Sequence, residues 1–403
     1  MNTRGFSAPS SLAAVVAVAF LALAAGPASA TPPQKPQRPV CPGPVAAGNA
    51  FCHARVVTDL KGTPQVATTP RGYGPAQFRG AYGLPGAAPV PQTIAIVDAY
   101  DDPKIASDLN AYSTQFGLPQ CNSANPCFEK VNQSGNPAGP FPQANSGWAL
   151  EIALDVEVAH AICPDCKILL VEASSNSLAN LAAAVSTAAK LGATEISNSY
   201  GGSEFSSEIN ETYAAPYNHP GIAVTVSSGD NGYGSFGFPA ASPSVITVGG
   251  TTLTLGPENT YGSESVWSGA GSGCSLYFSA PSWQSFLSAC AGKRGTADVA
   301  ADANPSTGAA VYDTVRYQGR SGWFQVGGTS LSSPLIAGVY ALAGGLPAES
   351  TAASGLYGHL GDSTVLHDIT SGSNGTCSTI MCKGAAGYDG PTGVGTPLGA
   401  GAF

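Results

Sequence analysis

Five short apolar runs recur through the middle of the chain and predict strands that are buried on both faces of a sheet. They are QTIAIVDAY (92–100), KILLVEA (167–173), ATEISNSY (193–200), GIAVTVSSGD (221–230) and PSVITVGG (243–250). Nearly continuous apolar runs of this length are typical of parallel sheets, which have both faces covered. Longer apolar stretches, 149–162 and 175–193, lie between some of these runs and predict helices. The alternation of strands and helices indicates an α/β domain with a largely parallel sheet.

The N-terminal region has a different pattern. Residues 1–30 contain Arg4, a short alanine-rich apolar run and Ala-Ser-Ala ending at Ala30, which predicts an export signal cut after Ala30 and a secreted, extracellular protein. The run is too short to predict a stable membrane-spanning helix. Residues 31–72 are rich in proline and show no clear periodicity, which is typical of a linker or short pro-segment. The compact domain is expected over 73–403.

The overall charge narrows the range of partners. The 403 residues carry a formal net charge of -9, and only 10% of them are charged. No basic stretch provides the positive surface that nucleic acid phosphates require. We therefore expect no nucleic acid partner, no membrane association after signal cleavage, and a monomer.

The ten cysteines fall into near pairs along the chain. The pairs are Cys41 with Cys52, Cys121 with Cys127, Cys163 with Cys166, Cys274 with Cys290, and Cys377 with Cys382. In an exported chain, an even number of cysteines in local pairs predicts disulfides, although the sequence does not establish their connectivity. The CPDC stretch at 163–166 is also compatible with a redox motif or half a zinc site. A disulfide is favoured there, because no second pair has zinc spacing and the pair does not open a helix.

Two of the predicted strands end in polar residues that form turns. Asn198 to Gly201 follow one strand, and Ser227 to Asp230 follow another. Functional groups of open α/β sheets gather just beyond the carboxyl ends of the strands, which makes both loops candidates for a site. Taken alone, each loop is better explained as a turn.

Glu151 and Asp155 are four residues apart on the predicted helix 149–162. A step of four residues rotates about 40° past a full turn, so the two carboxylates share a face. Their neighbours are apolar, and a poorly solvated pair of acids tends to share one proton and to have a raised pKa. Such a pair can act as a general base in acid. His160 lies about 180° from Glu151 around the helix, so we expect it to be a structural residue.

A Gly-Gly-Thr-Ser turn leads into a second apolar helix in VGGTSLSSPLIAGVYALAGG. Ser330 is therefore near a helix N-terminus, where free amides and the helix dipole favour developing negative charge. An ordinary N-cap serine has much the same pattern. The two preceding glycines distinguish this site, because they allow a ligand to approach the backbone closely.

Several motifs in order resemble the sedolisin family, the serine-carboxyl peptidases with a subtilisin-like fold. GGTSLSSPLIAG is similar to the family's nucleophile segment, ALEIALDVEVAHAICP to its glutamate and aspartate helix, and VSSGDNGYG to its oxyanion aspartate. The resemblance covers residue 73 to the C-terminus. It implies a three-layer α/β fold with a mainly parallel central sheet flanked by helices. It also implies Ser330 as nucleophile, Glu151 as general base, Asp155 as its tuning partner and Asp230 as a protonated oxyanion donor.

The same resemblance implies further site residues. It places substrate-binding residues at Ser199, Tyr200, Gly201, Ser228 and Gly229. It also places one structural Ca²⁺ site at the carboxylates of Asp368 and Asp389 and the carbonyls of Ile369, Ala385 and Gly387. The position of Ala385 rests on spacing alone. Two loop aspartates that form turns would give a similar pattern.

Two departures from the family pattern leave alternatives open. Sedolisins usually carry a large folded propeptide, whereas roughly forty residues separate the signal from the domain here, and Gly327 replaces the first serine of the nucleophile motif. The sequence favours a secreted, acid-acting endopeptidase that hydrolyses protein or peptide substrates through an acyl-enzyme on Ser330. One alternative is a catalytically silent binding protein with the same fold. The other is a subtilisin-type peptidase with a histidine base, in which AIVDAYDD would place Asp98 at the triad aspartate.

Overall fold

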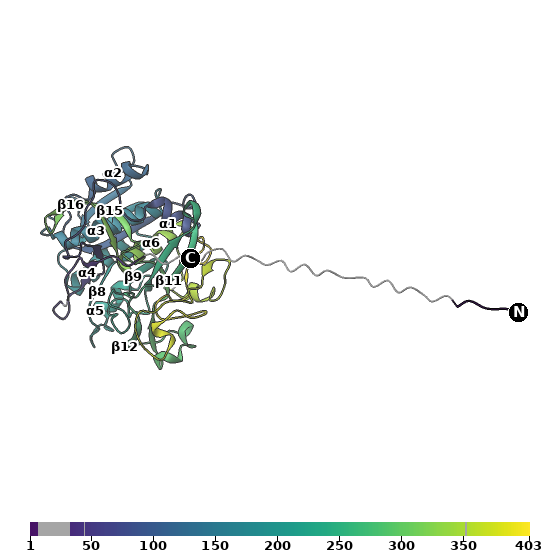
Figure 1. The fold of residues 1–403 in the computed structure, drawn as a ribbon. Coiled ribbons are helices and arrows are strands. Elements are labelled where there is room, and N and C mark those ends of the chain that lie inside the picture. Colours follow the sequence, from purple (N-terminus) through teal and green to yellow (C-terminus); the bar gives the residue numbers. More distant parts are fainter. Residues whose placement is uncertain (7–32, 44, 351–352) are drawn as a thin grey trace.

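A central sheet of eight strands organises the computed structural model, which describes residues 1–6, 33–43, 45–350 and 353–403 (Figure 1). Most of the expected signal, residues 7–30, lies outside the described residues. The strand order is β11, β10, β9, β7, β4, β6, β5, and β14 pairs with β10. The strands are β4 (Thr93–Ala99), β5 (Phe128–Asn132), β6 (Lys167–Ala173), β7 (Glu195–Asn198), β9 (Ala223–Ser227), β10 (Ile246–Leu255), β11 (Tyr261–Val266) and β14 (Val299–Asp302). All pairs in this sheet are parallel except β10 with β11.

The five predicted apolar strands are confirmed as β4, β6, β7, β9 and β10, and all but β11 and β5 at the edges are almost wholly buried. The predicted helices are confirmed as α3 (Ser146–Ile162) and α4 (Leu178–Lys190). Both begin at a side-chain cap, because Asn145 accepts the amides of Gly147 and Trp148, and Ser177 accepts the amide of Asn180. The parallel α/β architecture therefore follows from the apolar pattern.

Helices cover the sheet and bring the candidate site residues together. α6 (Thr329–Ala343) packs against α3 and against β7, β9 and β14, while α4 packs against β4 and β6. The other helices are α1 (Pro75–Ala81), α2 (Ile105–Phe116), α5 (Glu211–Ala214) and α7 (Ser354–Tyr357), with 3₁₀ turns η1 (Ala215–Tyr217), η2 (Pro257–Asn259), η3 (Ser282–Gln284), η4 (Ser288–Cys290) and η5 (Ile380–Cys382). The fold is the expected α/β arrangement, with a mainly parallel central sheet flanked by helices.

The proline-rich N-terminal segment forms strands that pair with the body of the domain. β1 (Gln37–Pro39) and β3 (Arg55–Val57) join β16 (Arg320–Gly327) and β15 (Ala309–Tyr317) in a four-stranded sheet. β2 (Phe51–Cys52) pairs with β8 (Tyr200–Gly201). The sequence predicted no strand here, because elements of two or three residues are too short to show a periodicity. The remaining strand pairs are β12 (Gly273–Ser279) with β13 (Lys293–Thr296) and β17 (Leu366–His367) with β18 (Thr396–Pro397).

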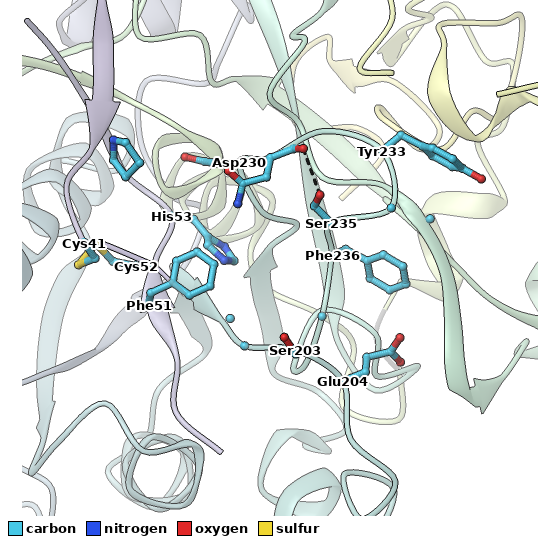
Figure 2. A pocket seen from close by; sticks show the side chains of 18 of the residues that line it. Cys41, Phe51, Cys52, His53, Ser203, Glu204, Asp230, Tyr233, Ser235 and Phe236 are labelled. Carbon is cyan, nitrogen blue, oxygen red and sulfur yellow. Dashed lines mark hydrogen bonds between the residues drawn. A yellow bond between two sulfur atoms is a disulfide. The ribbon is translucent and has the colours of Figure 1, made fainter. Parts of the chain in front are cut away.

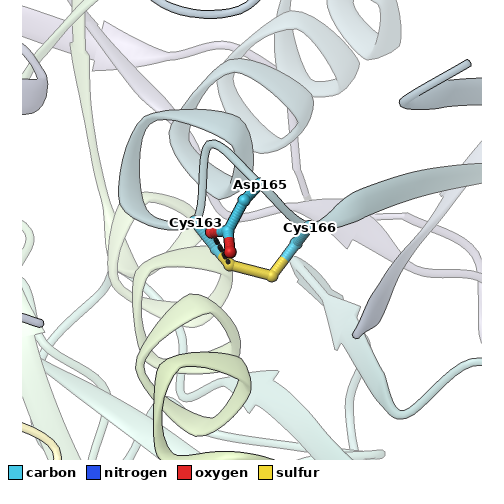
Figure 3. A group of neighbouring side chains, drawn as sticks. All are labelled: Cys163, Asp165 and Cys166. Carbon is cyan, nitrogen blue, oxygen red and sulfur yellow. Dashed lines mark hydrogen bonds between the residues drawn. A yellow bond between two sulfur atoms is a disulfide. The ribbon is translucent and has the colours of Figure 1, made fainter. Parts of the chain in front are cut away.

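All ten cysteines form disulfides, in the five local pairs that the spacing predicted. Figure 3 shows the bond between Cys163 and Cys166, with the Asp165 side chain beside it. The CPDC stretch follows the C-terminal end of α3 and closes the turn into β6, so its sulfurs are held in a structural link. Among the described residues, no helix has the length and apolar character needed to cross a bilayer.

Candidate active site

Ser330 is the second residue of α6, and its side chain is fully buried. Its hydroxyl donates to the carbonyl of Ser199 at 3.2 Å. Gly328 precedes the helix with φ of 99°, a conformation that favours glycine. A Cβ at this position would also collide with the Asp230 carboxyl, so the close approach of these two residues requires glycine. The nucleophile segment is thus held against the acid at 230.

α3 brings Glu151 and Asp155 to the same place, and both are fully buried. Within the described chain, none of their four carboxyl oxygens has a hydrogen-bond partner. Burial, followed by the negative charges of Asp155 and Asp98, raises the pKa of Glu151 well above its usual range, and the nearby Ser330 hydroxyl opposes this rise. Burial likewise raises the pKa of Asp155, against an opposing effect of the Ser199 side chain. Two such acids side by side favour a state in which one proton is held between them.

Asp98, near the end of β4, is a third acid in this cluster, which the sequence placed in the site only under the alternative with a histidine base. Its side chain is fully buried, and neither carboxyl oxygen has a partner among the described residues. Burial and the charges of Asp155 and Glu172 raise its pKa. The sequence does show that Asp98 lies at the carboxyl end of a buried strand, where site residues gather. A structural acid at that position would give the same pattern. Neither oxygen of Asp98 therefore bonds to a histidine among the described residues. The charge of Asp98 interacts instead with the two acids of α3.

Asp230 follows β9 and faces the first turn of α6. One of its oxygens accepts from the Thr329 amide at 2.7 Å and from the Thr329 hydroxyl at 3.0 Å. The other oxygen, Oδ2, is buried without a partner among the described residues. Burial raises the pKa of Asp230 to about 7, although the charge of Arg55 and the bonds from Thr329 lower it. Below neutral pH the acid is therefore protonated and can donate a hydrogen bond from Oδ2.

The five residues expected to bind substrate lie beside these acids. Tyr200 and Gly201 form β8, directly after the Ser199 carbonyl that accepts from Ser330. Gly229 donates its amide to the Thr329 hydroxyl at 3.0 Å, and the buried Ser228 hydroxyl has no described partner. A cavity of about 860 Å³ opens next to this cluster, lined by Gly201 and Asp230 among others (Figure 2). The structure thus gathers the two polar loops at one end of the sheet.

No histidine side chain is hydrogen-bonded to the Ser330 hydroxyl, and all five histidines of the chain lie in its described part. His53 pairs with the Ser227 hydroxyl, His160 donates to the Pro119 carbonyl, His219 bonds to the Pro216 carbonyl, His359 faces Asp362, and His367 stacks on Tyr261. The expectation of a structural role for His160 is therefore confirmed. A histidine base for Ser330 has no candidate in this geometry.

The residues expected to bind calcium converge in the C-terminal loops. Asp389 is buried and accepts from the Ala385 amide at 3.0 Å, while Asp368 accepts from the Gly387 amide at 3.0 Å. Burial raises the pKa of Asp389 to about 7, and the charge of Asp368 contributes to the rise. No Lys or Arg among the described residues forms an ion pair with either acid. None of the described hydrogen bonds uses the carbonyls of Ile369, Ala385 or Gly387, so this set of oxygens fits a hard cation.

Known proteins with a similar sequence and fold are peptidases. Residues 143–353, just over half of the chain, match the subtilase family. Sedolisin of Pseudomonas sp. (strain 101) is 28% identical over 367 residues, which cover 82% of this chain and 60% of sedolisin. Kumamolisin of Bacillus sp. (strain MN-32) is 29% identical over 401 residues, covering 88% of this chain and 67% of kumamolisin. The chain thus spans less than two thirds of the length of sedolisin.

Solved structures agree with this relationship. Pseudomonas sedolisin, a serine-carboxyl proteinase solved with two molecules of pseudo-iodotyrostatin, superposes with a TM-score of 0.65 at 29% identity, covering 82% of this chain and 96% of the solved chain. The psychrophilic protease S41, at 16% identity and a TM-score of 0.52, shares the fold. The chain therefore belongs to the subtilase family, and it is similar in sequence and fold to sedolisin.

Proposed function

We propose that this chain is a secreted serine-carboxyl endopeptidase that hydrolyses peptide bonds in acid. The observation that carries the proposal is the set of buried side chains around Ser330: a pair of acids without hydrogen-bond partners among the described residues, a third acid at Asp230, and no histidine side chain bonded to the serine hydroxyl. The N-terminal signal pattern and five disulfides support secretion. Protein or peptide substrates follow from the same chemistry.

In the proposed reaction, Ser330 Oγ turns from the Ser199 carbonyl toward Glu151, which accepts its proton as Oγ attacks the substrate carbonyl. Asp155 and Asp98 keep the basicity of Glu151 high by placing negative charge beside it. Glu151 then gives the proton to the leaving amine, and water hydrolyses the acyl-enzyme by the reverse sequence.

Charge on the carbonyl oxygen develops between the Ser330 amide and Asp230. The amide is at the N-terminus of α6, where the helix dipole favours negative charge. Asp230 Oδ2 would donate the second hydrogen bond while its acid is protonated. Since the pKa of Asp230 is about 7, the donor is lost as the pH rises through neutrality. The acidic pH optimum follows from this requirement.

A calcium ion would be held by Asp368, Asp389 and the carbonyls of Ile369, Ala385 and Gly387. Its charge would offset the repulsion between the two acids and brace the C-terminal loops. The chemistry at Ser330 does not use it.

The test is hydrolysis of a denatured protein from about pH 2 to about pH 8 by the wild type, Ser330→Ala and Glu151→Gln. We expect wild-type activity only in acid, and a loss in both variants of roughly 10⁴-fold or more. Glu157→Gln is a matched control, because Glu157 is also fully buried on α3 but bonds to the Tyr312 amide. Activity near neutrality that survives Glu151→Gln would contradict the proposal, and inactivity at every pH would leave the silent binding protein.

A further inference from the structure

The N-terminal segment runs through the candidate active site as an extended strand. Phe51 and Cys52 pair in antiparallel fashion with Gly201 and Tyr200, the strand expected to bind substrate. One residue earlier, the Ala50 amide donates to the Asn176 carbonyl at 2.8 Å. Figure 2 shows Phe51 and His53 on one side of the pocket and Ser235 and Phe236 on the other. The segment therefore lies where an extended peptide substrate would gain its main-chain hydrogen bonds.

The backbone of His53 makes the two hydrogen bonds expected of the residue that precedes the bond to be cut. Its amide donates to the Ser199 carbonyl at 3.0 Å, and its carbonyl accepts from the Ser330 amide at 3.2 Å. A Cβ on Gly328 would collide both with this carbonyl oxygen and with the unpartnered Oδ2 of Asp230, so the two oxygens lie on the same side of Gly328. The His53 carbonyl is thus hydrogen-bonded to one proposed oxyanion donor and lies near the other.

The side chain of His53 is almost fully buried beside this carbonyl. It is 5% exposed, and its Nδ1 is 2.8 Å from the Ser227 hydroxyl. A Cβ on Gly201 would come within 2.8 Å of the imidazole, and one on Gly229 within 3.9 Å. The pocket wall is therefore made of glycine backbone on two sides, with one hydroxyl to orient the ring.

The chain continues past the site as a bound strand. Arg55 and Val56 pair with Gly327 and Val326, the residues that lead into the nucleophile turn. Upstream, the Cys41–Cys52 disulfide fixes the residue before His53. Both cysteines precede His53, so a cut after His53 would leave no disulfide between the two pieces.

We propose that the chain is its own first substrate and is cut between His53 and Ala54. The inference rests on the proposed peptidase function. Ser330 Oγ bonds to the His53 carbonyl carbon, the bond from that carbon to the Ala54 nitrogen breaks, and the serine proton passes through Glu151 to the Ala54 amine. Water then releases His53 as a free carboxyl group and restores Ser330. The site in its mature form accepts peptides with an imidazole or similar planar polar ring before the cut.

The test follows the full-length protein at acid pH by intact mass and N-terminal sequencing, in parallel with hydrolysis of a denatured protein. We expect a chain beginning at Ala54 and a disulfide-closed peptide ending at His53 that separates without reductant. Ser330→Ala and Glu151→Gln should stay full-length. Hydrolysis of the denatured protein without an Ala54 terminus would overturn this inference alone, whereas absence of both cuts would overturn it together with the proposed function.

A pair of proline variants tests the position of the cut. Ala54→Pro places a ring carbon on the leaving nitrogen, and no described hydrogen bond uses the Ala54 amide, so the substitution removes none of the described hydrogen bonds. Its matched control is Ala47→Pro in the same disulfide loop, where the Asn49 amide bonds to the Ala46 carbonyl and Gly48 has φ of 80°. Proline is favoured at that turn position. We expect the cut to be lost in Ala54→Pro and kept in Ala47→Pro, and equal cutting of both would contradict the assignment.

A short peptide removes any dependence on folding of the variants. The peptide AFSHARVV copies residues 50–57 with serine in place of Cys52. The processed enzyme should cut it between His and Ala, and should cut the reordered peptide AFSAHRVV at least about tenfold more slowly at that position. Equal cleavage of the two would show that the pocket does not select His53.

Discussion

Two of the regions that hold buried acids differ in how fully those acids are hydrogen-bonded. Near β14, the Asp298 carboxylate accepts from the Arg294 guanidinium at 2.5 Å, from the Thr247 amide at 2.7 Å and from the Tyr357 hydroxyl at 2.8 Å. Around Ser330, Glu151 and Asp155 are equally buried but have no cation and no described hydrogen-bond partner. A satisfied buried charge holds structure, whereas an unsatisfied one is available to take up or give a proton.

Glu151→Gln should show the largest difference between the two regions, because it should affect activity strongly and stability little. It removes the proposed base and should lower kcat/KM by roughly 10⁴-fold. Because it also removes a buried acid that is repelled by its neighbours, the free energy of unfolding should stay level or rise. Steady-state kinetics and urea unfolding of the same preparation measure both effects. A large loss of stability would place Glu151 with the structural acids.

Asp298→Asn should show the opposite behaviour. It leaves the fully buried Arg294 without its counter-charge, so the free energy of unfolding should fall by about 3–5 kcal/mol. Activity per folded molecule should be unchanged, since Asp298 is not among the groups around Ser330. Urea unfolding with active-site titration checks both statements. Stability equal to the wild type would contradict the comparison.

Asp230 variants should sharpen the role of the unpartnered oxygen. Asp230→Ala should lower kcat by about 10²–10³-fold, as expected for loss of one oxyanion donor. Asp230→Asn keeps a donor that needs no proton, so its activity should no longer decline as the pH rises through about 7, the pKa of the native acid. The pH profile of kcat/KM measures this. A decline that is identical in both proteins would assign the titration to another group.

The free energy of unfolding should also depend on pH, in the direction set by the buried acids whose pKa is raised. Burial raises the pKa of Asp102, Asp230 and Asp389 to about 7, and that of Glu172 to about 9. Folding then favours the protonated acids, so their contribution is complete below the unfolded pKa of about 4 and is lost as the pH rises through 7 to 9.

Each of these groups contributes a slope of at most about 1.4 kcal/mol per pH unit. Burial lowers the pKa of His53 to about 4 and also lowers the pKa of His160, His219 and His367, so these four groups act in the opposite direction below about 6.5. They are fewer than the buried acids whose pKa is raised, and those acids still titrate above that pH. Urea unfolding at intervals from about pH 5 to about pH 8 should show decreasing stability. Stability that rises over this range would contradict the prediction.

Removal of calcium should have the smallest effect. A chelator should lower the melting temperature by a few degrees, as expected when binding adds about 2.7 kcal/mol at a hundredfold excess over Kd. Ca²⁺ should restore the melting temperature and Mg²⁺ should not, because carbonyl-rich loops fit the larger ion. In Asp389→Asn the chelator should have no effect. A persistent effect there would place the ion elsewhere.

Local patterns predicted much of the fold and of the catalytic set. The apolar runs at β4, β6, β7, β9 and β10 are long and buried, so their character is readable without knowing their partners. Glu151 and Asp155 are related by one helical turn, and the five disulfides close short loops. Such relations are local in the chain. The resemblance to a family then indicated which of these residues form one site.

The sequence by itself thus determined the parallel α/β sheet, the paired acids of α3 and the serine at the start of α6, because each depends on neighbours within one element. The tertiary structure decided how distant segments meet. Asp98 joins the acids through strand packing, and Phe51 to Arg55 enter the cleft through pairing with residues about 150 to 270 positions away. A strand of two residues is too short for its sequence pattern to indicate its partner. The position of residues 51–55 in the cleft is therefore evident only from the tertiary structure.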